Sequence, residues 1–144
     1  MVADDAQALR TSVDQISIQG RGAGGVAGMK LKPGASIVGV GLAPEGAMVL
    51  SVTDTGTAKL TDAAEVPAKG RGTGGVRLTR FKNETKLAWA HVGPVDELVA
   101  VVGQEDNPTL PDSTPVPLTL SPTRRDTQSA TTEDRLLAVG TRRF

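Results

Sequence analysis

The chain has 144 residues, with 16 basic residues balanced by 16 acidic ones, so it has the length of one domain or of a fragment, and its net charge identifies no partner. Its 17 glycines and 9 prolines favour turns and short strands, and the scarcity of aromatic residues leaves Val, Leu, Ile and Ala to form a core. The absence of cysteine excludes disulfides and thiolate metal sites and fits a reducing cytoplasm. No apolar run could span a bilayer and the acidic start is not a signal peptide, so we expect a cytoplasmic protein.

Six short runs rich in β-branched or apolar residues, most of them bounded by Gly, Pro, Asp or Asn, predict β-strands. In chain order these runs are Val13–Ile18, Ile37–Leu42, Met48–Thr53, Val76–Phe81, Leu87–Val92 and Leu98–Val102. Residues 54–57 (Asp-Thr-Gly-Thr) predict a hairpin turn in which Gly56 adopts a positive φ. The fourth run alternates cleanly only as far as Thr79, which predicts a bulge or a strand end near Arg80. Helix signals are poor throughout, so we expect an all-β, antiparallel fold.

The composition changes near Gln104. From there to Thr132 the chain carries five of its nine prolines among many Ser, Thr and Asp residues, which predicts an extended, largely unstructured connection. The run Leu136–Gly140 predicts a last strand that docks back, ahead of a basic end at Arg142 and Arg143. We therefore divide the chain into a β part (1–103), a Pro-rich extended segment (104–132) and a C-terminal strand with a basic tail (133–144).

One phrase occurs twice, fifty residues apart. Residues 19–26 read Gln-Gly-Arg-Gly-Ala-Gly-Gly-Val and residues 69–76 read Lys-Gly-Arg-Gly-Thr-Gly-Gly-Val, with six of the eight positions identical. A repeat of this period indicates a stack or ring of supersecondary units. Glycine permits close backbone approach and arginine binds phosphate, so the phrase points to a long, regularly spaced anionic partner.

The balanced net charge conceals a strong segregation of charge along the chain. Residues 19–32 contain three positive side chains and no negative one, and residues 69–86 contain six positive and one negative. Residues 93–116 contain five negative side chains and no positive one. Because both basic clusters coincide with the repeated phrase, we interpret them as functional surfaces and not merely as solvated faces.

Three interpretations of the repeated phrase compete. Both copies fit G-x-G-x-x-G, but neither lies between a buried strand and a helix, as a dinucleotide site requires. A second interpretation is a tight glycine turn between β units, with the arginine solvated or bonded to carbonyls. The third is a rim loop that offers backbone N–H groups and an arginine to DNA phosphates.

The phrase resembles the box of the C-terminal domain of type IIA DNA topoisomerase A subunits, the family of DNA gyrase and topoisomerase IV. The family's box reads Gln-Arg-Arg-Gly-Gly-Lys-Gly, of which the first copy keeps Gln19, Arg21, Gly22 and Gly25. Residues 8–10 (Ala-Leu-Arg) and the second copy with its continuation to Leu87-Ala88-Trp89 extend the resemblance, particularly to actinobacterial members of the family. It covers roughly residues 3–103 well and the tail only loosely.

The resemblance implies a β-pinwheel, a ring of four-stranded antiparallel blades whose basic rim bends and wraps DNA, and this chain would be an incomplete ring. The partners that it implies are double-stranded DNA, the remainder of the topoisomerase A subunit, and the B subunit, with no cofactor or metal. In such ATP-dependent isomerases the catalytic tyrosine lies in another domain, and this chain contains no tyrosine. We therefore expect no cleavage chemistry in this segment.

The residues expected to contact the DNA backbone, without reading its sequence, are the basic and box residues of both clusters. They are Gln19, Arg21, Gly22, Gly25, Lys30, Lys32, Lys69, Arg71, Gly72, Gly75, Arg77, Arg80 and Lys82. We expect the second cluster to contribute more affinity because it carries more positive charge. Each copy has glycine where the box has a second arginine and a lysine, which leaves gyrase-like wrapping and a weaker, topoisomerase IV-like role both open. The rival interpretation is a structural or protein-interaction β module with little DNA affinity.

Other candidate sites are weaker. His91 is the sole histidine and, without cysteines, a poor start for a zinc site. Trp89 lies in an apolar strand, which favours a core position over base stacking. The acidic pairs Asp96/Glu97 and Glu105/Asp106 fit solvated loops, or an acidic patch that restrains the DNA-binding rim, better than acid–base catalysis.

Overall fold

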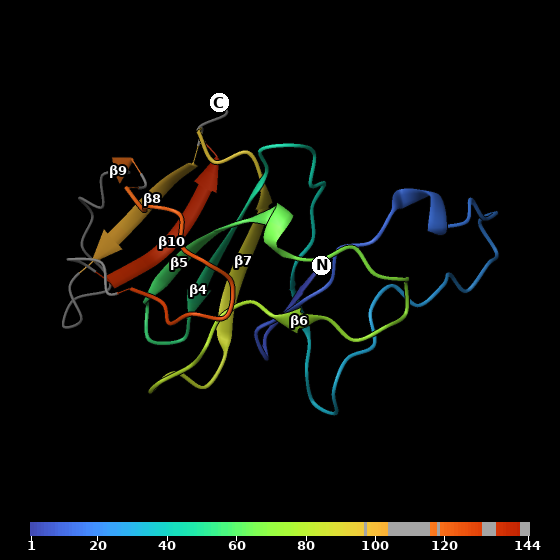
Figure 1. Cartoon of the computed structure of the whole chain (residues 1–144), viewed down its shortest axis with the longest axis horizontal. Helices are drawn as coiled ribbons and strands as arrows, with labels where there is room; N and C mark the ends of the chain where they lie inside the picture. The colour runs from blue at the N-terminus through green and yellow to red at the C-terminus, as the bar shows by residue number, and fades with distance from the viewer. Residues whose placement is uncertain (97, 104–115, 118, 131–134, 142–144) are drawn as a thin grey trace.

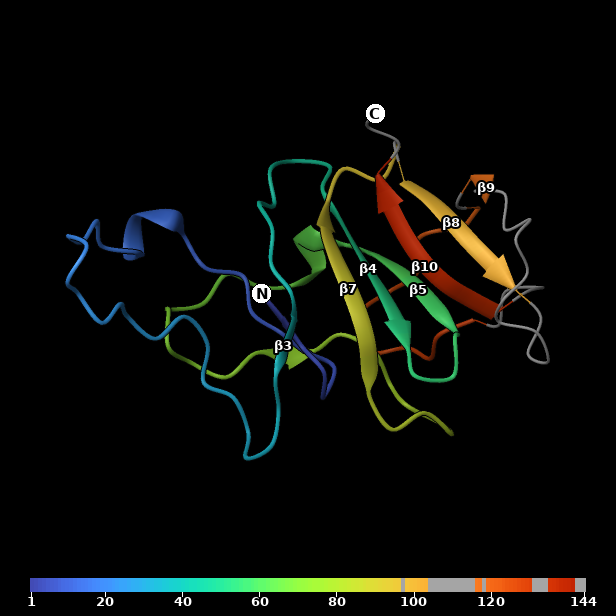
Figure 2. The same ribbon diagram turned by 180° about the vertical axis from the view of Figure 1, so that it is seen from behind.

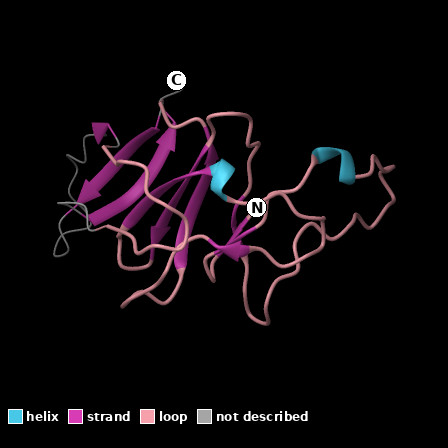
Figure 3. Cartoon of the chain, in the orientation of Figure 1, coloured by secondary structure: helices cyan, strands magenta, loops and turns pink. Residues whose placement is uncertain are grey.

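The computed structural model describes residues 1–96, 98–103, 116–117, 119–130 and 135–141 (Figure 1). Its regular structure is almost entirely β (Figure 3). The strands are β1 (Val2–Ala3), β2 (Gln7–Ala8), β3 (Ile37–Gly39), β4 (Met48–Thr53), β5 (Ala58–Asp62), β6 (Val76–Arg77), β7 (Leu87–Gly93), β8 (Leu98–Gly103), β9 (Val116–Pro117) and β10 (Arg135–Thr141). The described helices are two 3₁₀ turns, η1 (Val13–Gln15) and η2 (Ala63–Glu65), and neither is long or apolar enough to cross a membrane. The all-β prediction is confirmed.

The described strands form three sheets in which every pair is antiparallel. The first sheet has the order β3-β1-β2-β6, the central sheet β5-β4-β7 and the third sheet β10-β8-β9. These sheets do not close into a ring within the described part of the chain, as expected for an incomplete pinwheel. The hairpin between β4 and β5 turns where predicted, with Gly56 at φ 81° and the Thr53 N–H donating to the Thr57 carbonyl at 2.9 Å.

The central sheet is covered on both faces, as Figures 1 and 2 show from opposite sides. Along β4, Val49 belongs to a core shared with Val2, Ala8 and Leu78, from the first sheet and the chain beyond β6. Leu50 and Val52 belong to a second core, which includes Leu136 of β10. Because successive strand residues point to opposite faces, β4 supplies both cores, and this explains why nearly all of its residues are buried.

Three predicted strands differ from the structure. The prediction of a strand at Val13–Ile18 was wrong, because η1 replaces it: the Ser12 hydroxyl accepts from the Asp14 N–H, and no neighbouring strand pairs with this exposed segment in the described structure. The run Val76–Phe81 is a strand only at Val76–Arg77, and the run Ile37–Leu42 ends at Gly39. The runs of β4, β7 and β8 form strands as predicted.

Residues 119–130, which we call the strap, lie beside β5 and the chain that follows β6, with a turn at residues 125–126 (Figure 1). The Thr123 N–H donates to the Leu60 carbonyl at 2.8 Å, and the Ala130 and Ala58 N–H groups donate to each other's carbonyls. The strap is the main described portion of the Pro-rich segment, of which residues 104–115, 118, 131 and 132 lie outside the described residues. The apolar run 136–140 lies within β10, which pairs with β8, while Arg142 and Arg143 lie outside the described residues.

Candidate nucleic-acid interface

The first copy of the phrase lies in a long exposed loop (residues 11–36), which we call the first loop and which projects away from the sheets (Figure 1). Every residue of the copy is exposed. A Cβ added at any of its four glycines would meet no heavy atom within 4 Å. Arg21 has no hydrogen-bond partner among the described residues, so its guanidinium and the surrounding backbone are accessible to an external partner.

The second copy follows η2, ends at the first residue of β6 and is packed against β2. Ala8 of β2 pairs with Val76, the last residue of the copy and the first of β6. A Cβ at Gly75 would lie only 2.4 Å from the Ala8 carbonyl oxygen, so no side chain fits there. Gly25, at the equivalent position of the first copy, has open space around it but a φ of 78°. Glycine is therefore required for steric reasons in the second copy and for its backbone conformation in the first.

The half-buried Arg71 of the second copy bonds to the first loop. Its Nε donates to the Gln15 carbonyl at 3.1 Å and its Nη1 donates to the Ala27 carbonyl at 2.9 Å. Its backbone N–H donates to Oε1 of Gln15 at 2.9 Å. This is the carbonyl-bonded arginine of the tight-turn interpretation, and it bonds to the first loop on either side of the first copy.

The second copy lies beside residues 28–30 of the first loop, which follow the first copy closely. The Gly72 N–H donates to the Gly28 carbonyl at 2.7 Å, and the Lys30 N–H donates to the Thr73 carbonyl at 3.0 Å. These bonds place Lys30 of the first basic cluster next to the second copy. The fold thus joins the two glycine-rich loops that the sequence singles out.

The predicted lysines differ in their surroundings. Lys32 forms an ion pair with Asp5, with Nζ and Oδ2 3.1 Å apart. The side chains of Lys30, Lys69 and Lys82 are exposed. The backbone N–H of Lys82 donates a hydrogen bond to the Glu84 carboxylate. This bond is the main cause that lowers the pKa of Glu84 to about 2, so Glu84 stays ionised within the second cluster.

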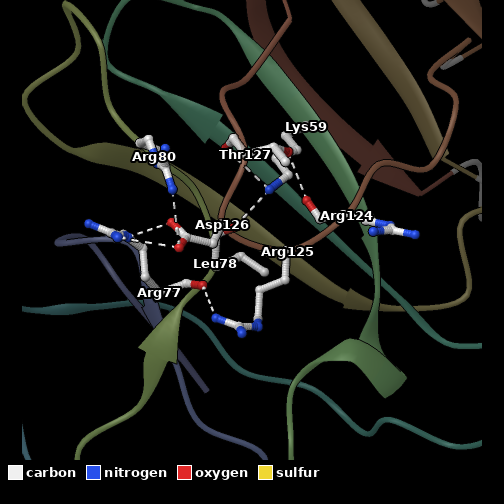
Figure 4. A network of polar contacts seen from close by, with 8 residues as sticks. All are labelled: Lys59, Arg77, Leu78, Arg80, Arg124, Arg125, Asp126 and Thr127. Carbon is white, nitrogen blue, oxygen red and sulfur yellow. Dashed lines mark hydrogen bonds and ion pairs between the residues drawn. The ribbon is translucent and has the colours of Figure 1, made fainter.

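Arg77 and Arg80 converge on one carboxylate of the strap, Asp126 (Figure 4). Arg77 donates from Nε to Oδ1 at 2.5 Å and from Nη2 to Oδ2 at 3.3 Å, while Arg80 donates from Nη2 to Oδ2 at 3.4 Å. The hydrogen bonds from Arg77 are the main cause that lowers the pKa of Asp126, and the same contact raises the pKa of Arg77. The two predicted phosphate-binding arginines therefore already hold an anion.

Sequence reasoning missed the residues that position this cluster. Arg125 of the strap donates from Nη1 to the Arg77 carbonyl at 3.0 Å. Lys59 of β5 is 2% exposed and donates from Nζ to the Leu78 carbonyl at 2.7 Å and to the Thr127 carbonyl at 3.3 Å; burial lowers its pKa to about 8. The triplet Arg-Arg-Asp at 124–126, unusual within a Pro/Ser/Thr-rich segment, was the available signal for the strap, whereas nothing in the sequence indicates that Lys59 is buried.

The weaker candidates fall outside this surface. Trp89 packs against the second core, as expected, and its ring stacks on His91 with centroids 6.2 Å apart. Nε2 of His91 lies 2.9 Å from the Pro94 carbonyl oxygen. Asp96 is exposed, whereas the other three residues of the acidic pairs (Glu97, Glu105 and Asp106) lie outside the described residues.

Comparison with known proteins places both copies of the phrase in one family. The family model of the DNA gyrase C-terminal domain, beta-propeller, matches residues 1–44 and 47–92. The crystal structure of the C-terminal domain of DNA topoisomerase IV superposes with a TM-score of 0.75 at 22% sequence identity, a likeness that establishes the fold. It covers 96% of this chain, which spans 44% of that structure's chain. No curated protein matches the chain by sequence.

Proposed function

The chain belongs to the family of the DNA gyrase C-terminal domain, and from this premise we propose that it is a non-catalytic segment of a type IIA topoisomerase A subunit that binds and wraps double-stranded DNA. Its partners are DNA, the remainder of the A subunit, and the B subunit, which together form an ATP-dependent isomerase. Because its proposed substrate is DNA, we assign the segment to the cytoplasm. The catalytic domains are separate from it.

The observation that carries this proposal is the adjacency of the two glycine–arginine loops. Bare glycines at Gly20, Gly22 and Gly24 leave the backbone N–H groups open to a phosphate, with no Cβ in the way. Exposed Arg21 lies among these glycines in sequence, and exposed Lys30 adds positive charge beside the second copy. Such contacts bind the DNA backbone in a fixed position without reading its sequence.

Arg71 has a different part in this mechanism. By bonding to the carbonyls of Gln15 and Ala27, it holds the first loop against the second copy. A loop held in this way loses less conformational entropy when it binds DNA. Arg71 thus supports the proposed interface chiefly by positioning, and the exposed cations make the contacts.

The test is a titration of the whole chain with duplex DNA of mixed sequence over a range of salt concentrations. If about six phosphates are neutralised, the log–log plot of affinity against salt should have a slope of about −5, with little dependence on DNA sequence. A flat salt dependence, or no binding at low salt, would contradict the proposal.

A protein-interaction module is the second candidate, because the described structure exposes large apolar side chains. Ile18, Val40 and Leu42 are 103%, 70% and 73% exposed. Val40 and Leu42 line an apolar groove of about 530 Å³ together with Val13, Ile16 and Val66. This candidate predicts partner binding that is insensitive to salt, which the same titration separates from DNA binding.

A further inference from the structure

The carboxylate of Asp126 lies where a backbone phosphate would bind between two of the predicted DNA-contacting arginines. We propose that Asp126 stands in for a phosphate between Arg77 and Arg80, and that the DNA backbone reaches these arginines only by displacing it. The inference rests on the proposed function, because it requires that the chain binds DNA. It assigns to Asp126 a role in limiting DNA affinity.

The donor geometry fits a phosphate as well as it fits the carboxylate. Arg77 presents Nε and Nη2 to the two oxygens of Asp126, the forked arrangement in which arginine also binds phosphate. Arg80 adds a third donor from the neighbouring position. The side chains of Arg77 and Arg80 are 53% and 56% exposed, so a duplex can reach both arginines from solvent.

The backbone of Asp126 is fixed, whereas its side chain lies at the surface. The Asp126 N–H donates to the Leu78 carbonyl at 2.8 Å, and its φ is 58°. On either side of it, Arg125 bonds to the Arg77 carbonyl and Lys59 bonds to the Thr127 carbonyl (Figure 4). Displacement by phosphate therefore requires a change of side-chain rotamer and no movement of the strap.

This exchange has a consequence for affinity. A phosphate that enters the cluster gains hydrogen bonds from Arg77 and Arg80, but Asp126 loses the same bonds and stays nearby as a negative charge. The two arginines therefore contribute less net affinity than a pair without an acidic partner. Removal of the Asp126 charge should make the full attraction available to DNA.

The experiment compares two variants that each remove one negative charge. Asp126→Asn keeps the strap backbone, because asparagine readily adopts the left-handed conformation. Glu45→Gln changes an exposed acid in the turn before β4, for which the described structure shows no side-chain partner. Asp126→Asn should bind duplex DNA about three to ten times more tightly at low salt and steepen the log–log slope by about one, whereas Glu45→Gln should change affinity less than twofold.

A second measurement follows the arginines directly and does not depend on the variant. The NMR signal of the Arg77 Nε–H should shift when duplex DNA is added to the unchanged protein. Inorganic phosphate, used as a small probe, should shift that signal at lower concentration in Asp126→Asn than in the unchanged protein.

The outcomes distinguish this inference from the proposed function. If the unchanged protein binds DNA with the expected salt dependence, but Asp126→Asn binds no more tightly than Glu45→Gln, then the inference is wrong and the proposed function stands. An Arg77 Nε–H signal that does not move on DNA binding would have the same meaning. If neither protein binds DNA at low salt, the proposed function fails and this inference fails with it.

Discussion

The first copy of the repeated phrase extends into solvent, whereas the second is packed between β2 and the first loop. Arg21 has no partner among the described residues, but Arg71 bonds to the carbonyls of Gln15 and Ala27. Gly25 has open space around it, but Gly75 lies against the backbone of Ala8. Identical residues are thus exposed to solvent in the first copy and packed against the chain in the second, because neighbouring segments determine what each copy can contact.

We expect the largest difference between the two copies in the free energy of unfolding that is lost when the equivalent glycines are replaced. Gly75→Ala should lower the free energy of unfolding by about 3 kcal/mol, because the new methyl group would collide with the Ala8 backbone. Gly25→Ala should cost about 1 kcal/mol, because only the left-handed backbone strain opposes it. Chemical denaturation of both variants measures the difference, and equal losses would show that the second copy is not packed as described.

The next difference concerns DNA affinity. Replacement of Arg77, Arg80 and Lys82 together by alanine should weaken DNA binding about tenfold more than replacement of Arg21, Lys30 and Lys32, because Arg77 and Arg80 converge on one anion and can hold a single phosphate jointly. Arg71 is left unchanged in both variants because it holds the first loop. Titration at one low salt concentration compares them, and a greater loss from the first cluster would place the principal contact surface there.

A smaller difference is expected between the two arginines of the phrase. Arg71→Ala should lower the free energy of unfolding by about 1 kcal/mol, because it removes two charge-assisted hydrogen bonds at a half-buried site. Arg21→Ala, the matched control, should leave stability within about 0.5 kcal/mol of the unchanged protein. Hydrogen exchange of the first loop should become faster only in Arg71→Ala; unchanged exchange would mean that Arg71 does not hold that loop.

The smallest expected effect is a pH dependence of stability. Lys59 anchors the chain after the second copy, and its pKa is lowered from 10.5 to about 8 in the folded protein. Between about pH 8 and 10.5 the unfolded chain therefore binds more protons at this lysine, so its contribution to the free energy of unfolding rises with pH. Lys59→Met should remove this rise, on the order of 1 kcal/mol, whereas Lys86→Met at an exposed lysine should keep it. Identical pH profiles for the two variants would contradict the assigned role of Lys59.

Local patterns predicted the parts of the fold that depend on local chemistry. The runs at Met48–Thr53 and Leu87–Val92 became β4 and β7 because their apolar residues fit a buried sheet, and Gly56 marked the hairpin turn. The run at Val13–Ile18 failed because a strand also needs a neighbouring strand to bond with, which local sequence does not reveal. The repeated phrase marked the two loops, although its two different environments depend on tertiary contacts.

The contacts of Asp126 with Arg77 and Arg80 could not be predicted from the sequence either, because they too depend on tertiary structure. Asp126 is 49 residues from Arg77 and 46 from Arg80 in sequence, and no periodicity links positions so far apart. Lys59 occupies an ordinary strand position, and the two carbonyls that it bonds, of Leu78 and Thr127, are 19 and 68 residues away in sequence. Such long-range pairings are the part of a candidate site that a single sequence specifies least.

The strap also has a consequence for the order in which the molecule matures. Its residues are translated after those of β8, yet they pair with β5 and with the chain around Thr79, which leave the ribosome much earlier. During synthesis, Arg77 and Arg80 are therefore present for some time without the acid that later holds them. The ion pairs of this cluster can therefore form only after the strap has been synthesised, which makes them late contacts of the folding chain.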